Sequence, residues 1–302
     1  MSAWDEISAA GLPIVQVLHD LYLLCPKDTM FNKGHSCERQ CPMCALLRRN
    51  HAHASRQVAA VIGVSRFMLD RLLAHGYFSQ ASRHVVLNAS TTPPPAERSA
   101  QDGEKRTLRF GYIGTLSENK GVAWLIEQFQ ALSMDATLTI AGRGKLDYEA
   151  ELRALAEPNR VRFQGYQDTQ AFMASIDVLV VPSLWAEPFG LVAVEGCASH
   201  LPVIASDMGG LPEIIRDNLN GLLCSPADRD SLGRAMLQLY RDRALRERLA
   251  SQARESVLPL LDMERMLDDY QSILRKTLEG GRAQHEYQSA DYPAGPAQPA
   301  GD

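Results

Sequence analysis

The chain has 302 residues, a net charge of −5, 45% hydrophobic and 22% charged residues, and this composition is typical of a soluble globular protein of about two domains. The acidic balance argues against a nucleic-acid partner, which normally requires a basic face. No apolar run approaches the roughly 20 residues that cross a bilayer, and the first residues lack the basic and apolar regions of a signal peptide. We therefore expect a cytoplasmic protein whose six cysteines are thiols or metal ligands rather than disulfides.

The first part of the chain, residues 1–89, contains three short candidate strands, at 13–18, 58–64 and 84–87. Three consecutive prolines and a polar run follow at 90–106, and together they predict a linker. We therefore expect residues 1–89 to form a small domain of their own.

From residue 107 onward, short β-rich runs alternate with helical patterns. The predicted strands are 108–114, 136–142, 161–165, 177–182, 202–206 and 221–224, and the helices between them include 121–132, 145–156, 169–176 and 191–199. This alternation is typical of βαβ units on a parallel sheet, and several strands are apolar throughout, as expected when helices cover both faces. We predict a doubly wound, Rossmann-like domain whose ligand binds at the carboxyl ends of the strands.

The C-terminal part of the chain is predicted to be helical. It is rich in arginine after residue 226, and an amphipathic segment at 262–279 predicts a final helix. Residues 280–302 lack apolar periodicity, and we expect them to be disordered.

Two glutamates, Glu187 and Glu195, stand in an otherwise apolar stretch, "SLWAEPFGLVAVEGC". A helix is expected to begin near Phe189 and Gly190, which places Glu187 in a loop and Glu195 about five residues into the helix, or ~8 Å along its axis. A helix N-terminus can bind phosphate, and this spacing is close to the step from a diphosphate to its ribose, whose hydroxyls a carboxylate accepts. The spacing therefore suggests a nucleotide-sugar site, although it equally fits two solvated charges near a helix end.

Three further glycine-bearing turns follow predicted strands. The turn at 111–121 contains Gly114 and ends with Lys120, a cation that can reach a phosphate. The turn "AGRG" at 141–144 lacks the third glycine of a dinucleotide fingerprint, which argues against a dehydrogenase. The third turn places Gly209 and Gly210 before a helix. Each turn alone could be a simple loop, but together they predict one ligand crevice.

Residues 107–279 resemble the C-terminal domain of retaining glycosyltransferases of family four, which have the two-domain GT-B fold. The resemblance rests on "YIGTLSENKG", "IAGRG", "VRFQGY", "PSLWAEPFGLVAVEG", "PVIASDMGGLPEII" and "NGLLC", in this order. The spacing Glu-x7-Glu from Glu187 to Glu195 is the signature of that family. A weaker resemblance extends into 13–26, 61–72 and 85–90.

The resemblance implies an α/β, GT-B-like fold with a complete donor-binding domain at 107–261 and an incomplete acceptor-side Rossmann-like domain at 1–89. The helix at 262–279 would cross back to the N-terminal domain, unless it simply ends the second domain. The implied reaction moves a hexose from a UDP-, GDP- or ADP-linked sugar to a glycan, lipid-linked or small-molecule acceptor, with retained anomeric configuration and no catalytic metal.

The resemblance also assigns roles to residues. Glu195 would bind the donor ribose, and Glu187 would contact the donor sugar or balance charge at the reaction centre. Lys120 would stabilise the leaving diphosphate, and His19, in "VLHD", would face the donor sugar. The remaining candidate donor contacts lie in the glycine turns and at the helix start: Gly114, Thr115, Gly142, Arg143, Phe189, Gly190 and Leu191.

The chain departs from the family pattern in three places. Thr115 stands where the family usually has an arginine, so that charge is missing unless Arg143 supplies it. "NAS" at 88–90 replaces the family's "N-G" followed by an apolar residue and aspartate. The first strand of the family's N-terminal domain, with its glycine-rich loop, has no counterpart, which suggests that Met1 is an internal or misassigned start or that the gene is truncated.

These departures keep alternative functions open. The chain could be a catalytically impaired remnant or a partner-dependent nucleotide-sugar-binding subunit, and a nucleotide-sugar epimerase of the same fold is a weaker alternative. The arginine-rich helices at 241–256 are expected to be a solvated charged face, with a peripheral contact to lipid headgroups at the inner membrane face as the less favoured reading.

Four cysteines lie close together in the N-terminal region, with the spacing C-x11-C-x3-C-x2-C: Cys25, Cys37, Cys41 and Cys44. This spacing resembles zinc-ligand spacing, and His35 could replace one ligand. A structural zinc, an iron–sulfur cluster and unliganded or redox thiols are all compatible with it. Cys197 and Cys224 are expected to be small core residues.

Overall fold

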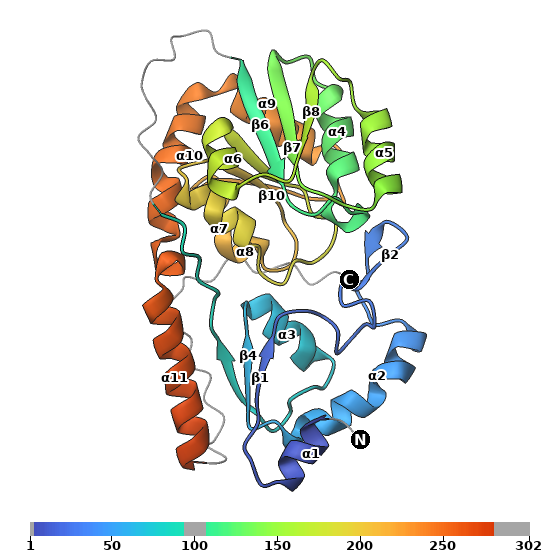
Figure 1. Ribbon diagram of the computed structural model, residues 1–302, viewed down its shortest axis with the longest axis vertical. Coiled ribbons are helices and arrows are strands. Elements are labelled where there is room, and N and C mark those ends of the chain that lie inside the picture. Colours follow the sequence, from blue (N-terminus) through green and yellow to red (C-terminus); the bar gives the residue numbers. More distant parts are fainter. Residues whose placement is uncertain (1–2, 94–106, 281–302) are drawn as a thin grey trace. The chain divides into compact units, whose positions relative to one another are not determined.

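The computed structural model describes residues 3–93 and 107–280. Their contacts divide them into two compact units. Unit 1 holds residues 3–30, 37–88 and 263–280, and unit 2 holds residues 31–36, 89–93 and 107–262. Figure 1 labels the elements of both units.

Unit 2 is built on a six-stranded parallel sheet with the order β11-β10-β9-β6-β7-β8. The strands are β6 (Leu108–Ile113), β7 (Ala136–Ala141), β8 (Val161–Gly165), β9 (Val178–Val181), β10 (Val203–Ser206) and β11 (Gly221–Cys224). The chain starts in the middle with β6, adds β7 and β8 on one side, and then returns to pair β9 with β6, where Phe110 lies opposite Val178. The strand order therefore reverses between β6 and β9, which is where sheets of this kind bind ligands.

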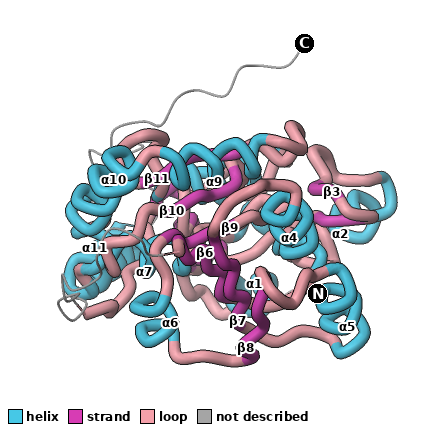
Figure 2. The backbone as a smooth tube through the Cα atoms, turned by 90° about the horizontal axis from the view of Figure 1, so that it is seen from above, coloured by secondary structure: helices cyan, strands magenta, loops and turns pink. Residues whose placement is uncertain are grey.

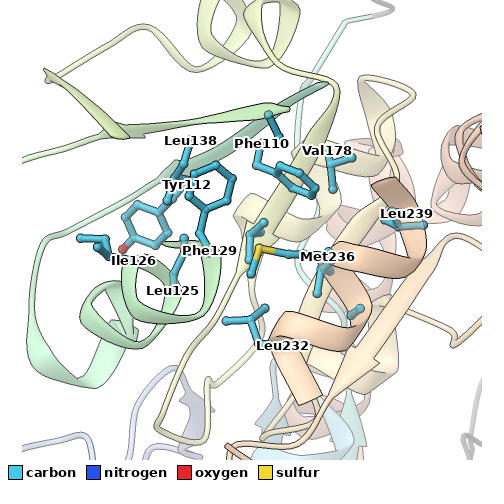
Figure 3. Close-up of a cluster of buried hydrophobic side chains, with 14 of the residues drawn as sticks. Phe110, Tyr112, Leu125, Ile126, Phe129, Leu138, Val178, Leu232, Met236 and Leu239 are labelled. Carbon is cyan, nitrogen blue, oxygen red and sulfur yellow. The ribbon is translucent and has the colours of Figure 1, made fainter. Parts of the chain in front are cut away.

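Helices cover both faces of this sheet (Figure 2). They are α4 (Val122–Gln130), α5 (Leu146–Leu155), α6 (Thr169–Ser175), α7 (Leu191–Ala198), α8 (Leu211–Ile214), α9 (Ser231–Arg241) and α10 (Arg243–Ser256), with the short turns η2 (Glu118–Lys120) and η3 (Leu258–Leu261). Phe110 on β6 packs edge-on against Phe129 on α4 with ring centroids 6.0 Å apart, and Met236 of α9 joins the same core (Figure 3). On the opposite face, a Cβ at Gly111 would lie 2.6 Å from Ile176, directly after α6.

Burial on both faces explains the composition of the strands. All four residues of β9 and all four of β10 are buried. Both strands are therefore apolar without alternation, apart from Ser206 at the end of β10. The predicted α/β architecture with a parallel sheet is confirmed, and the six strands fall where the sequence places them.

Unit 1 contains a three-stranded parallel sheet with the order β1-β4-β5. Its strands are β1 (Val15–Leu18), β4 (Ala60–Gly63) and β5 (Ser82–Val85), and its helices are α1 (Ala3–Ala9), α2 (Pro42–Ala54), α3 (Arg66–Ala74) and α11 (Met263–Gly280), with the turn η1 (Ser55–Gln57). The hairpin of β2 (Phe31–Asn32) and β3 (His35–Ser36) precedes α2 in the chain, but its contacts assign it to unit 2. Although α11 lies at the far end of the described chain, its Ile273 packs with Ile62 and Val86, and Arg265 donates to the carbonyl of Leu87 at 2.9 Å.

The third strand of unit 1 begins and ends two residues earlier than the sequence predicts. β5 pairs with β4 from Ser82 to Val85 and ends opposite Gly63, where β4 itself ends. Val86 and Leu87 are buried but lie beyond the pairing, so burial and not strand pairing explains their apolar character. Most of the predicted linker and the predicted disordered tail, at 94–106 and 281–302, lies outside the described residues. Among the helices that are described, none has the length and apolar character needed to span a membrane.

Candidate functional site

The loops that follow β6, β7, β9 and β10 touch one another through glycines. Gly121 has a φ of +71°, and a Cβ there would lie 1.9 Å from the carbonyl oxygen of Pro182. Gly142 has a φ of +137°, and a Cβ there would lie 1.8 Å from the carbonyl oxygen of Gly114. Since real Cβ atoms do not approach so closely, these positions require glycine for both conformation and space. The four loops form one continuous edge at the carboxyl ends of the strands.

At the centre of this edge, Lys120 and Glu187 form an ion pair. Lys120 ends the turn η2 after β6, and Glu187 lies in the loop after β9 and is only 7% exposed. The ammonium Nζ of Lys120 lies 2.6 Å from Oε1 of Glu187, and Ser183 Oγ donates to the same oxygen at 2.6 Å. A buried carboxylate is costly without such partners. Because β6 and β9 are neighbours in the sheet, the strand order itself brings the two side chains together.

Two aromatic residues surround this ion pair. The ammonium of Lys120 lies 5.3 Å from the ring centroid of Trp185, a distance at which a cation is attracted to an indole face. Trp185 is 8% exposed, and its Nε1 has no hydrogen-bond partner. The hydroxyl of Tyr112 donates to the carbonyl of Thr115 at 2.8 Å, and burial together with the charge of Glu187 raises the pKa of Tyr112 well above its ordinary value. The tyrosine therefore stays neutral beside the ion pair.

The helix α7 begins directly after this loop. Gly190 precedes it with a φ of +113°, and a Cβ there would lie 2.6 Å from Cδ2 of Leu211. No side chain caps the first turn of α7. The amide of Ala193 donates to the carbonyl of Gly190 at 2.9 Å, which leaves the amides before it available to an anion, and the helix dipole favours an anion at this end.

Glu195 lies on α7 and is half-buried. Burial raises its pKa above the ordinary value of a glutamate. None of the hydrogen bonds or ion pairs found among residues 3–93 and 107–280 involves its side chain, so the structure does not bring it into contact with Lys120 or Glu187. A half-buried acceptor without a protein donor is suited to the hydroxyl group of a ligand.

The other predicted site residues have varied surroundings. Thr115 is exposed, Phe189 is buried at 3%, and Leu191 is 42% exposed. Arg143 is also exposed, and its Nη2 lies 3.3 Å from where a Cβ of Gly165 would stand, at the end of β8. The structure therefore places this guanidinium beside β8, and no contact found within 3–93 and 107–280 links it to Lys120.

His19 belongs to unit 1. It follows β1 immediately, at the carboxyl end of that strand, and its side chain is exposed. The neighbouring Asp20 accepts a hydrogen bond from the amide of Tyr22 at 2.8 Å and so shapes the turn after His19.

The four clustered cysteines are only partly brought together. The Sγ atoms of Cys25 and Cys44 are 4.0 Å apart, and the amide of Cys44 donates to Sγ of Cys41 at 3.3 Å. In the described parts of the chain, no group of three or more His, Cys, Asp or Glu side chains is placed to hold a metal ion. The predicted zinc site is therefore not confirmed. Cys197 and Cys224 are core residues as expected, with 0% and 2% exposure.

Sequence reasoning missed Ser183, Trp185 and Tyr112 as members of this site. Ser183 and Trp185 lie within four residues of Glu187 in one loop, and this proximity is the signal that could have identified them. Tyr112 gave no such signal, because an aromatic residue in a buried strand is ordinarily a core residue.

Comparison with known proteins shows which family this domain resembles. Residues 107–242 match the family described as Glycosyl transferases group 1. The chain is 33% identical over 236 residues to a glycogen synthase of Mycobacterium tuberculosis, covering 73% of this chain and 55% of the relative. It is 34% identical over 165 residues to the lipopolysaccharide core biosynthesis glycosyltransferase LpsE of Rhizobium meliloti, covering 54% and 48%. The chain thus spans about half the length of the curated relatives it matches.

Solved structures agree with this assignment at the level of the fold. HepE of Anabaena in complex with UDP and glucose superposes with a TM-score of 0.73 at 24% identity, covering 91% of this chain and 74% of that one. Sucrose-phosphate synthase of Thermosynechococcus elongatus gives the same TM-score at 21% identity, covering 91% and 71%. The fold is therefore of the GT-B glycosyltransferase type, and residues 107–242 are similar to the glycosyl transferases group 1 family.

Proposed function

We propose that this protein is a glycosyltransferase that moves a hexose from a nucleoside-diphosphate sugar to an acceptor with retention of anomeric configuration. The observation that carries the proposal is the ion pair of Lys120 and Glu187, which lies at the reversal of strand order and beside the open first turn of α7. A cation and free helix amides on one edge suit a diphosphate.

In this proposal, departure of the nucleoside diphosphate is the step that the site assists. Lys120 and the amides of Phe189, Gly190 and Leu191 stabilise the negative charge that develops on the leaving group. Glu187 and Trp185 hold the ammonium of Lys120 in place before the donor arrives. A cation fixed in advance needs no reorganisation during the reaction, which is what makes such stabilisation effective.

The remaining residues would position the two substrates. Glu195 accepts hydrogen bonds from the ribose hydroxyls, consistent with its lack of a protein donor, and the glycines at 114 and 142 let the donor approach the backbone. HepE was solved with UDP and glucose, and UDP-glucose is therefore the donor to test first. LpsE is named for lipopolysaccharide core biosynthesis, which favours a glycan or lipid-linked acceptor.

A second candidate is a nucleotide-sugar-binding subunit that needs a partner chain for transfer. The observation in its favour is that Thr115 brings no charge to the site and that Arg143 lies beside Gly165 instead. With one cation fewer, the diphosphate would be bound but its departure would be poorly assisted.

Hydrolysis of the donor separates the two candidates and tests retention. Incubation with UDP-glucose, followed by proton nuclear magnetic resonance at early times, should show α-glucose before it mutarotates if the enzyme retains configuration. Release of β-glucose would contradict retention. Binding of UDP-glucose without release of glucose or transfer to any acceptor would favour the partner-dependent subunit.

A further inference from the structure

The helix α2 buries an arginine and exposes apolar side chains, which is the reverse of an ordinary amphipathic helix. Within it, Arg48 and Ala54 are buried, and Arg48 is only 8% exposed. Met43, Leu46 and Leu47 are 64%, 60% and 55% exposed. A helix at a protein surface normally points its apolar residues inward. The three exposed residues have i, i+3, i+4 spacing and so share one face, which we call the α2 apolar face.

The contacts within unit 1 hold α2 in this orientation. The guanidinium carbon of Arg48 lies 3.9 Å from the ring centroid of Tyr22. The hydroxyl of Tyr77 donates to the carbonyl of Arg48 at 3.2 Å and to that of Leu23 at 2.5 Å. Because Arg48 is fixed toward the interior, the opposite side of the helix must face outward. These contacts therefore fix the orientation of α2 in which its apolar face is exposed.

The segment that contains α2 is basic, although Glu38 directly precedes it and Asp5 of α1 accepts a hydrogen bond from Gln57. The protein has a net charge of −5, yet residues 39–69 contain no Asp or Glu. The same segment carries five arginines: Arg39, Arg48, Arg49, Arg56 and Arg66. Of these, Arg39, Arg49 and Arg56 are exposed near the helix. An apolar face bordered by cations is the pattern of helices that lie in the interface of an anionic membrane.

Other exposed apolar residues of the described chain lack this combination. Leu267, Leu274 and Leu278 are exposed on α11, but that helix carries four acidic residues against three basic ones, so its apolar residues lack a cationic border. Leu146 and Tyr166 are exposed singly, which is ordinary for a protein surface.

We infer that the α2 apolar face, with Arg39, Arg49 and Arg56 around it, docks unit 1 on the surface of an anionic lipid bilayer. The apolar side chains enter the boundary between headgroups and acyl chains, and the arginines pair with lipid phosphates. Neither three apolar side chains nor three cations alone give stable anchoring, so the binding is reversible and requires both. This inference does not depend on the proposed transferase activity.

Sedimentation with lipid vesicles tests the inference on the full chain. We expect the protein to partition at least tenfold more strongly to vesicles with one third phosphatidylglycerol than to pure phosphatidylcholine, and raising the salt concentration should weaken binding. The variant Leu46→Asp/Leu47→Asp should lose at least tenfold of the binding. Arg39→Glu/Arg49→Glu should lose the preference for anionic lipid. Leu146→Asp, which alters an 84% exposed leucine of unit 2, is the matched control and should bind as the unaltered protein does.

Three results would overturn the inference. The first is equal binding of the unaltered protein and Leu46→Asp/Leu47→Asp, with circular dichroism showing that both are folded. The second is no binding of the unaltered protein to anionic vesicles at low salt. The third is a dimer in light scattering that Leu46→Asp/Leu47→Asp dissociates, since the face would then be covered by a second copy of the chain.

Discussion

Lys120 and Glu187 are 67 residues apart in the chain, yet their side chains meet at 2.6 Å. Both are largely shielded, with side-chain exposures of 27% and 9%. The pairing depends on β6 and β9 being neighbours, because each residue belongs to the loop that follows one of these strands. The reversal of strand order, which is where sheets of this kind bind ligands, therefore also brings the cation and the carboxylate together.

The Lys120–Glu187 pair should contribute measurably to stability. In a double-mutant cycle with Lys120→Met and Glu187→Gln, we expect a coupling free energy of about 1–3 kcal/mol in urea unfolding. The exposed pair Arg243–Glu247, with side-chain exposures of 67% and 61%, is the control and should show no more than about 0.5 kcal/mol. Equal coupling in the two pairs would contradict the shielding that the structure shows.

Lys120→Met should also reduce activity strongly. Removing one stabilising group from a developing negative charge typically lowers kcat by about 10²–10³-fold. We expect this loss in kcat for donor hydrolysis or transfer, with a smaller effect on KM. A change in KM alone would mean that Lys120 binds the ground state and does not assist departure of the diphosphate.

Ser183 should act through Glu187. Its hydroxyl donates to the carboxylate oxygen that also receives Lys120, so Ser183→Ala should cost roughly 1.5–3 kcal/mol of unfolding free energy, as hydrogen bonds to charged groups do. Ser251→Ala is the control, since that exposed hydroxyl bonds only the carbonyl of Arg248, and its effect should be within about 0.5 kcal/mol. Unchanged stability of Ser183→Ala would show that this hydrogen bond contributes nothing.

Gly209 should tolerate no side chain. It has a φ of +62°, and a Cβ would lie 2.3 Å from the carbonyl oxygen of Glu187. Gly76 has a comparable φ of +78° but nothing within 4 Å of a Cβ. Gly76→Ala should therefore lower the unfolding free energy only by the strain of an alanine in the left-handed conformation, about 1–2 kcal/mol. Gly209→Ala should lower it clearly more, because the backbone of Glu187 would also have to move. Similar unfolding free energies for the two variants would disprove the close approach.

The charge of Glu195 should oppose folding. Burial raises its pKa in the folded protein, so the folded state favours the protonated carboxyl. The stability that the protonated Glu195 carboxyl contributes is fully present below its pKa in the unfolded chain. This stability is lost as the pH rises through its higher pKa in the folded protein. Glu195→Gln should therefore melt at a higher temperature than the unaltered protein at pH 7, with the difference shrinking toward pH 4. A variant less stable at pH 7 would reveal a stabilising partner of this carboxylate.

Thr115→Arg should supply the charge that the resemblance to family-four glycosyltransferases implies at this position. Thr115 is exposed, so an arginine fits without disturbing the core. If the nucleoside diphosphate binds at this edge, we expect its affinity to rise by about tenfold, equivalent to 1.4 kcal/mol. Unchanged affinity would place the phosphates away from position 115.

The sequence predicted the parallel sheet well because buried strands such as β9 and β10 must be apolar on both faces, and this gives short, recognisable runs. It also marked Glu187, which is a charge in an otherwise apolar stretch, and Lys120, which is a cation at a glycine turn before a helix. It did not predict their direct contact, which requires the order of strands in the sheet and not their order in the chain. Trp185 and Tyr112 were missed because their partners, Lys120 and Glu187, lie in the loop that follows the neighbouring strand.

The cysteines and α2 show the limits of local patterns more sharply. The spacing from Cys25 to Cys44 suggested four ligands, but spacing along an irregular loop does not fix the directions of the side chains. In α2, the apolar residues resemble those of any amphipathic helix, and only the inward position of Arg48 shows that they face outward.

Calorimetric titration with UDP, GDP and ADP is the decisive measurement for a nucleotide-sugar site in unit 2. We predict that one of these nucleotides binds with a stoichiometry of one, and that Glu195→Ala weakens it by tenfold or more while Leu146→Asp does not. Binding of none of the three, or equal binding by Glu195→Ala, would contradict the proposed donor site.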